Sequence, residues 1–133
     1  MNFQPQIWQK YIPPFLHVII SQMPIIIIRD RKATQEELDR MSYELGDYIK
    51  VVVDLEKGIL AGGGGMHFDE EQLLLEYGCE QKNLWGGGID FTTNEIDYNS
   101  MINIRPAANN PSRDILSDEI RKKFKKIVEE ILL

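Results

Sequence analysis

The C-terminal segment of the chain places the strongest constraint on its fold. Ser117 is a favourable helix N-cap, and acidic residues fill the turn that follows. Apolar residues then recur at helical spacing and form one wide stripe: Ile120, Phe124, Ile127, Val128, Ile131 and Leu132. An isolated helix with such a stripe is not stable in water. We therefore expect a helix from about residue 118 to the C-terminus, packed on an apolar surface that the rest of the chain supplies.

The first half of the chain supplies strands for that surface. Ile25 to Ile28 is a short apolar run, typical of a strand buried on both faces. Thr34 and Glu37 have the spacing of a capping box, so a helix should begin there. The β-branched residues 49–53 favour a second strand, and the glycine-containing turn at 56–58 should fold the chain back as a hairpin.

The second half repeats this alternation. Residues 70–77 predict a helix, and the segments NLWGGGIDF and EIDYNSMINIR predict two further strands. The predicted order is β-α-β-β-α-β-β-α. Because hairpins join most strands, we predict an α+β two-layer sandwich: a mostly antiparallel sheet of about five strands, with three helices packed on one face.

Composition excludes several classes of protein. The net charge of -6 (15 basic and 21 acidic side chains) argues against a broad nucleic-acid surface. No stretch reaches the roughly 18–20 apolar residues that span a bilayer, so no membrane association is expected. The single cysteine, Cys79, cannot form an internal disulfide. A reducing, cytoplasmic compartment is therefore the simplest expectation.

The N-terminal residues differ from the rest. Residues 1–22 contain three prolines and few charges, and Met23 stands directly before the first predicted strand. We interpret residues 1–22 as a leader or arm that is either outside the native protein or loosely attached to it. Residues 23–133 are expected to form a single α+β domain.

Four consecutive glycines, Gly62 to Gly65, precede the middle helix. Glycines between a strand and a helix are typical of phosphate loops, but this run lacks both the Walker lysine and hydroxyl and the dinucleotide spacing. The acidic residues 69–71 would also repel a phosphate from the helix N-terminus. We predict instead that Asp69 caps the helix and that the glycines bend the backbone.

His67 lies in the same loop. With Asp69 it forms a His-x-Asp pair, which suits half of a metal site or a general base held by a carboxylate. The chain has only one other histidine, His17, so a metal site would need further carboxylates such as Asp54, Glu56 or Asp90. The alternative is a histidine without such a role, and we assign no metal.

A second glycine run follows Trp85. Gly86 to Gly88 fall inside a predicted strand, where glycines indicate that another group approaches the backbone closely. That group is either a ligand, with Trp85 as a stacking wall, or the C-terminal helix, with Trp85 in the core. The sequence favours the helix.

The alternating segment NSMINIRP offers further candidates. Asn103 and Arg105 would project from the same strand face, and Arg105 can bind a carboxylate or phosphate with two hydrogen bonds. Alternatively, Arg105 pairs with Asp54 or Asp90 across the sheet. Ser100 has no nucleophile-elbow motif and no evident base, so a role as a nucleophile is disfavoured.

The segments HFDEEQLLLEYGCEQKNLWG and SMINIRP carry a resemblance. In these segments and over about residues 23–133, the chain resembles a family of small prokaryotic proteins that has only a domain-of-unknown-function label. His67, Asp69, Trp85, Ser100 and the stretch 103–106 fit its pattern. Gly88 departs from it, because the family pattern has asparagine there, so a polar contact is missing. The resemblance implies no activity.

Two hypotheses follow. The chain is a small binding or protein-interaction module, whose partner is reached through the N-terminal arm or an exposed sheet edge. Alternatively, it carries a small-molecule or enzymatic site for a small acidic ligand, with no cofactor assigned. The second hypothesis requires one pocket, whose candidate ligand-binding residues are His67, Asp69, Trp85, Ser100, Asn103 and Arg105.

Overall fold

The structure is a computed structural model, and it describes residues 25–133. The predicted leader or arm, His17 and Met23 lie outside the described residues.

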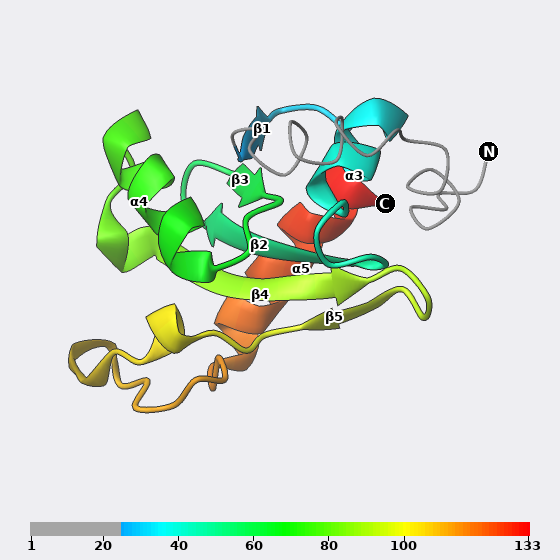
Figure 1. Cartoon of the computed structure of the whole chain (residues 1–133). Coiled ribbons are helices and arrows are strands. Elements are labelled where there is room, and N and C mark those ends of the chain that lie inside the picture. The colour runs from blue at the N-terminus through cyan, green and yellow to red at the C-terminus, as the bar shows by residue number, and fades with distance from the viewer. Residues whose placement is uncertain (1–24) are drawn as a thin grey trace.

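The described residues form one five-stranded antiparallel sheet (Figure 1). Its spatial order is β1-β3-β2-β4-β5, so the β2–β3 hairpin and β4 occupy the middle. The strands are β1 (Ile26–Arg29), β2 (Tyr48–Asp54), β3 (Ile59–Gly62), β4 (Leu84–Asp90) and β5 (Glu95–Asp97).

Between residues 25 and 133, three α-helices and three short 3-10 helices connect or follow the strands. The α-helices are α3 (Gln35–Met41), α4 (His67–Tyr77) and α5 (Asp118–Leu132). The 3-10 helices are η1 (Gln81–Asn83), η2 (Met101–Asn103) and η3 (Pro106–Ala108). The predicted α+β class, with five strands and three α-helices in the order β-α-β-β-α-β-β-α, is confirmed.

Two of the three predicted helix starts are confirmed in atomic detail. At α3, the Thr34 hydroxyl accepts a hydrogen bond from the Glu37 backbone N–H (3.1 Å), and the Glu37 carboxylate accepts one from the Thr34 N–H (2.9 Å). At α5, the Ser117 hydroxyl accepts from the Ile120 N–H (3.2 Å). These contacts satisfy amides that a helix leaves without intrahelical partners.

The sheet is covered on both faces, which differs from the two-layer sandwich expected with all helices on one face. Val51 and Val53 of β2 join a core with Phe124 and Val128 of α5, which passes behind β2 and β4 in Figure 1. Val52 points the other way, into a second core that includes Leu74 of α4. The buried residues of this core are Val52, Ile59, Ala61, Leu74, Cys79 and Leu84. Because successive side chains of a strand alternate between faces, the uninterrupted valine run requires apolar partners on both.

The segment after β5 also departs from the prediction. The alternation of NSMINIRP predicted a long strand, but β5 ends at Asp97 and the chain continues as irregular backbone and η2. The Ser100 hydroxyl accepts a hydrogen bond from the Ile102 N–H (3.2 Å), which favours a turn at this point. In the described part of the chain, no helix is long and apolar enough to cross a membrane.

Candidate functional site

The start of α4 is organised differently from the sequence prediction. The helix begins at His67 with Met66 as its N-cap, and no side chain caps it. Asp69, predicted as the cap, lies in the first turn and is exposed. Glu70, the next residue, bonds back to the glycine run. Its Oε2 accepts a hydrogen bond from the Gly64 N–H (3.1 Å), and the side chain is fully buried. An amide of the glycine run is therefore occupied by the protein's own carboxyl group.

The glycine run on β4 separates two environments. A Cβ on Gly87 would stand 2.8 Å from Cζ of Phe124, so α5 approaches the strand there, as the sequence favoured. Trp85 is buried in the core on the same side.

Gly86 and Gly88 face the opposite side of the sheet. A Cβ on Gly86 would stand 2.7 Å from Cβ of Ser100, and a Cβ on Gly88 would overlap the Tyr48 phenol. The two glycines thus allow Ser100 and Tyr48 to lie directly over β4.

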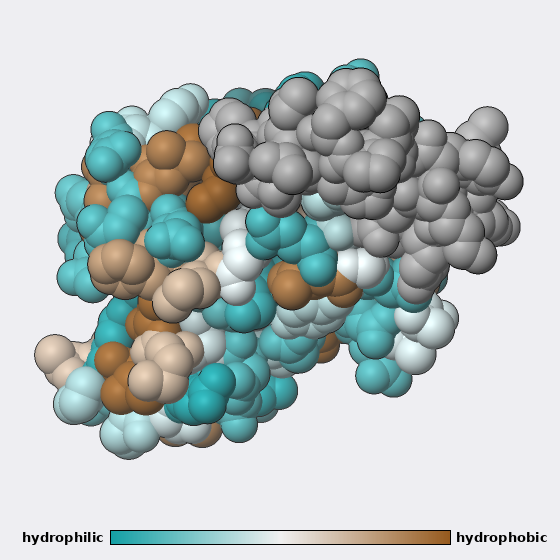
Figure 2. Space-filling model, in the orientation of Figure 1, coloured by the Kyte–Doolittle hydropathy of each residue, from teal (hydrophilic) through white to brown (hydrophobic). Residues whose placement is uncertain are grey.

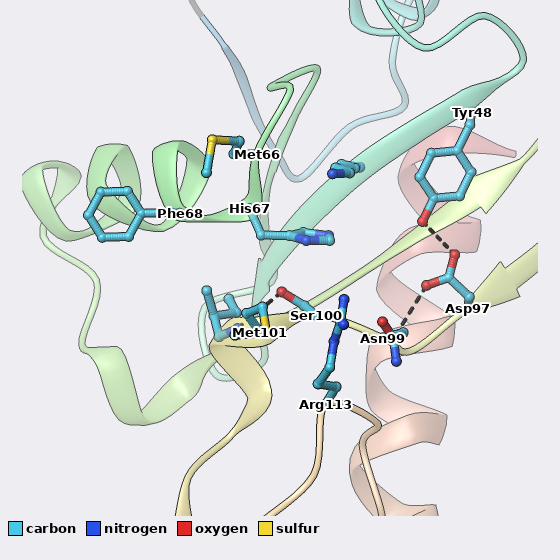
Figure 3. A pocket seen from close by; sticks show the side chains of 11 residues that line it. Tyr48, Met66, His67, Phe68, Asp97, Asn99, Ser100, Met101 and Arg113 are labelled. Atoms are coloured by element: carbon cyan, nitrogen blue, oxygen red, sulfur yellow. Dashed lines mark hydrogen bonds between the residues drawn. The ribbon is translucent and has the colours of Figure 1, made fainter.

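A pocket of about 590 Å³ opens on this side of the sheet, between the start of α4 and the segment after β5 (Figure 3). Its size is typical of small-molecule sites. It is lined by Tyr48, Lys50, Met66, His67, Phe68, Asp97, Asn99, Ser100, Met101, Ile102 and Arg113, and we call it the His67 pocket. Figure 2 shows hydrophobic surface on both sides of the gap between α4 and this later segment.

His67 is held in one orientation at the pocket. Its Nε2 lies 2.7 Å from the carbonyl oxygen of Gly87. A carbonyl only accepts hydrogen bonds, so Nε2 carries the proton and the neutral ring keeps a lone pair on Nδ1. Burial lowers the pKa of His67, and Lys50 and Arg113 lower it further, whereas the bond to Gly87 opposes this. The imidazole is therefore neutral at pH 7.

Two cationic side chains share the pocket with His67. The Lys50 Nζ donates a hydrogen bond to the Gly65 carbonyl (3.0 Å), which ties the end of the glycine run to β2. Arg113 is exposed. Figure 3 shows the side chains of Arg113, Ser100 and His67 pointing toward one another. This arrangement offers hydrogen-bond donors to an anion.

Asp97 is the one carboxylate among the described residues that line the pocket, and it is already engaged. The Tyr48 hydroxyl donates to Asp97 Oδ2 (2.5 Å), and the Asn99 backbone N–H donates to Asp97 Oδ1 (3.1 Å) (Figure 3). Burial, followed by the hydrogen bond to Asp97, raises the pKa of Tyr48, so its hydroxyl remains protonated. Asp97 is thus bound to Tyr48 and Asn99, and it forms no ion pair with Lys50 or Arg113.

Asn103 is a structural residue in this fold. It is fully buried, and its Oδ1 accepts a hydrogen bond from the Gly86 N–H (2.8 Å). Its Nδ2 faces the carbonyl oxygens of Gly86 (2.9 Å), Tyr98 (3.1 Å) and Arg113 (3.0 Å). One side chain therefore joins β4 to the two segments that carry Ser100 and Arg113, and it does not line the pocket.

Arg105 lies in a neighbouring environment. It donates to the Leu84 carbonyl oxygen and lies 3.8 Å from the Glu71 carboxylate. Its guanidinium carbon is 4.8 Å from the Trp85 ring centroid, a cation–π arrangement. The sequence alternatives Asp54 and Asp90 are not its partners. Arg105 lines a second pocket of about 590 Å³, and Met101 and Ile102 line both pockets.

The predicted single pocket is therefore not formed. Of the six candidates, His67 and Ser100 come together, whereas Arg105 lines the second pocket, Trp85 and Asn103 are buried, and Asp69 is exposed. Within residues 25–133, no group of three or more His, Cys, Asp or Glu side chains could hold a metal ion.

Sequence reasoning missed five polar residues of the pocket: Tyr48, Lys50, Asp97, Asn99 and Arg113. One signal was available. Lys50 interrupts an apolar strand sequence, YIKVVVD, on the face that Tyr48 shares.

Comparisons with known proteins identify a family and indicate no activity. No curated protein and no solved structure matches the chain. A family model described as "Protein of unknown function (DUF5674)" matches residues 26–131, close to the range over which the resemblance was expected. The chain therefore belongs to the DUF5674 family.

Proposed function

We propose that this protein binds a small anionic ligand, with a carboxylate as the favoured anion, in the His67 pocket. The observation that carries the proposal is the meeting of Lys50, Arg113 and the neutral His67 at one pocket, in a chain whose net charge is -6. Two cations and one carboxylate line the pocket, so its local charge is opposite to that of the whole chain. Positive groups in a concave site attract and orient an anion.

The rim of the pocket supports a ligand that is also partly apolar. Met66, Phe68 and Met101 are each more than half exposed, which is unusual for large apolar side chains. They line the same pocket as the cations. A ligand with an anionic end and an apolar body would cover these side chains while its charge meets Lys50 and Arg113.

Calorimetric titration of the purified full-length chain tests the proposal. The probes are 4-methylpentanoate and its amide, which match in shape and differ in charge. We expect the carboxylate to bind and the amide to bind at least about tenfold more weakly, since a hydrogen bond to a charged group contributes about 1.5–3 kcal/mol. Arg113→Ala should weaken carboxylate binding similarly, whereas Lys122→Ala, on an exposed position of α5, should not. Equal binding of acid and amide, or no binding of either, contradicts the proposal.

A second candidate function is protein interaction, and a specific observation favours it. Met66, Phe68, Met101 and Ile104 are 60%, 54%, 64% and 42% exposed and line the two adjoining pockets. Exposed apolar side chains grouped in this way are typical of protein-interaction surfaces. Photo-crosslinking from positions 68 and 104 in cells tests this: adducts of both positions with the same polypeptide support it, and the absence of protein adducts at either position counts against it.

For either function we propose a cytoplasmic location, because the single cysteine, Cys79, offers no internal disulfide. Cell fractionation with an antibody against the chain tests this, and recovery outside the cytoplasm would contradict it.

A further inference from the structure

The hydrogen-bond pattern around His67 narrows the class of ligand, and this step rests on the proposed function. The Nε2–H of His67 is used by the Gly87 carbonyl (2.7 Å). The lone pair on Nδ1 has no hydrogen-bond partner among residues 25–133. A neutral imidazole nitrogen in this state accepts a hydrogen bond and cannot donate one.

The other polar side chains around His67 mostly donate. Lys50 and Arg113 are cations with several N–H groups. Ser100 accepts from the Ile102 N–H, which leaves its own hydroxyl hydrogen as a donor. The Asp97 oxygens already accept from Tyr48 and Asn99. The pocket therefore offers donors for an anion beside Nδ1 of His67, an acceptor that has no hydrogen-bond partner among the described residues.

Asn99 is a less suitable acceptor for the same ligand. Its side chain is exposed, and its amide nitrogen donates to Asp114 (2.9 Å) at the protein surface. His67 is more enclosed, and its ring points into the pocket (Figure 3). An acceptor shielded from water gains more from a ligand donor than one that water already solvates.

We infer that the ligand is a carboxylate whose α-carbon carries a neutral hydrogen-bond donor, together with an apolar substituent. The carboxylate meets Lys50 and Arg113, and the donor meets Nδ1 of His67. The apolar substituent covers the rim at Met66, Phe68 and Met101.

The charge of the pocket selects against an ammonium as that donor. Lys50 and Arg113 outnumber the Asp97 carboxylate, so the net positive charge disfavours a free α-amino group, whereas a hydroxyl or an amide N–H carries no charge. The two sources of this shared chemistry are 2-hydroxy acids and N-acylated amino acids, the second including the C-terminal residue of a peptide.

The test compares four probes of one carbon skeleton by calorimetric titration of the full-length chain at pH 7.5. They are 2-hydroxy-4-methylpentanoate, N-acetyl-leucine, leucine and 4-methylpentanoate. If the ligand is a 2-hydroxy acid, 2-hydroxy-4-methylpentanoate should bind about fivefold more tightly than 4-methylpentanoate, and if it is an N-acylated amino acid, N-acetyl-leucine should. A roughly fivefold difference is the contribution of one net hydrogen bond. Leucine should bind more weakly than the better of these two.

His67→Phe keeps a ring and removes the acceptor. In this variant, the preference for the donor-bearing probe over 4-methylpentanoate should disappear, whatever the change in the affinity for 4-methylpentanoate itself. If the wild type binds the donor-bearing probes and 4-methylpentanoate equally, or if the preference survives in His67→Phe, the inference is overturned while the proposed function stands. If none of the probes binds, the proposed function fails and the inference fails with it.

A readout that does not depend on this variant uses the histidine nitrogen signals. With His17→Gln, His67 is the one histidine left in the chain. Its Nδ1 resonance should shift on addition of the donor-bearing probe and not on addition of 4-methylpentanoate. A Nδ1 resonance that responds equally to both probes would overturn the inference.

Discussion

The phenol of Tyr48 on β2 lies directly over the backbone of Gly88 on β4. A Cβ at Gly88 would overlap the ring and hydroxyl of Tyr48, and it would also stand 2.8 Å from the Ile49 carbonyl oxygen. From this position the Tyr48 hydroxyl reaches Asp97 on β5, so the missing side chain at position 88 allows a hydrogen bond that joins β2 to β5 across β4.

Gly88→Ala should therefore destabilise the protein by about 1–3 kcal/mol, as expected when a methyl group is forced into a packed site. Denaturant unfolding measures this. The double variant Gly88→Ala/Tyr48→Ala should lose less than the sum of the two single losses, because the ring is no longer displaced. Gly65→Ala is a control, since a Cβ there meets only the flexible Glu44 carboxylate, at 3.0 Å. Strict additivity of the two changes would contradict the proposed overlap.

Asn103 should tolerate neither truncation nor a change of charge. Asn103→Ala leaves the Gly86 N–H and the carbonyls around Nδ2 without their partner and should cost at least about 3 kcal/mol. Asn103→Asp should cost more at pH 7, because a carboxylate oxygen then faces carbonyl oxygens. In denaturant unfolding, the Asn103→Asp variant should have a lower free energy of unfolding than Asn103→Ala. Asn99→Ala, at an exposed position, is the control and should lose about 1 kcal/mol or less. An Asp variant as stable as the wild type would refute this role.

Glu70 should make the protein less stable at high pH. Burial raises the pKa of its carboxyl well above the usual range, although the Gly64 N–H and Lys50 oppose this and Asp69 reinforces it. A carboxyl whose pKa is higher in the folded chain stabilises fully below its unfolded pKa of about 4.3, and this contribution is lost as pH rises through the folded pKa.

Glu70→Gln removes that ionisation and keeps an acceptor for the Gly64 N–H. We expect the variant to exceed the wild type in free energy of unfolding by about 1 kcal/mol or more at pH 8, because each unit of pKa difference corresponds to about 1.4 kcal/mol. The two proteins should converge near pH 4. Exposed Glu76→Gln, on the same helix, is the control. A wild type that stays the more stable of the two at pH 8 would show that Glu70 is ionised and favourably paired.

The start of α3 should respond to acid in the opposite sense. The hydrogen bond from Arg31 (2.6 Å), with help from Thr34, lowers the pKa of Glu37 to about 2. The stabilisation is therefore present above the unfolded pKa of about 4.3 and is lost as pH falls toward about 2. Thr34→Ala and Glu37→Gln should each lower the free energy of unfolding by about 1 kcal/mol at pH 7. The loss stays this small because Arg31 is half exposed, so its ion pair with Glu37 contributes little beyond the helix cap. Thermal unfolding at pH 7 and pH 2 should show the Glu37→Gln deficit shrinking in acid, and an undiminished deficit would contradict the assignment.

Local patterns in the sequence predicted the elements of the fold. The Thr34–Glu37 cap, the valine run of β2 and the stripe of α5 each depend on neighbours within a few residues, and all three are present. The placement of α4 required knowing that Val52 faces a different core from Val51, which depends on the packing of distant elements. The alternation after β5 was misleading, because side-chain bonds of Ser100 and Asn103 replace the expected strand pairing.

The site was predictable only in part for the same reason. His67 was found from its local context, and Ser100 from the resemblance to the family. Lys50 reaches them through the register of β2 with β4, in which it stands opposite Gly88, and Arg113 arrives on a loop whose backbone Asn103 holds. Such pairings join residues far apart in the chain, and single-sequence periodicity contains no information on them.

The bare backbone at position 88 also restricts which residues can occupy position 48. A side chain at 88 and an aromatic ring at 48 compete for one volume, so a relative with asparagine at 88 should carry a smaller residue at 48. That asparagine could then bond to Asp97 in place of the phenol. Covariation of positions 48 and 88 would thus mark two alternative ways of building the same pocket wall.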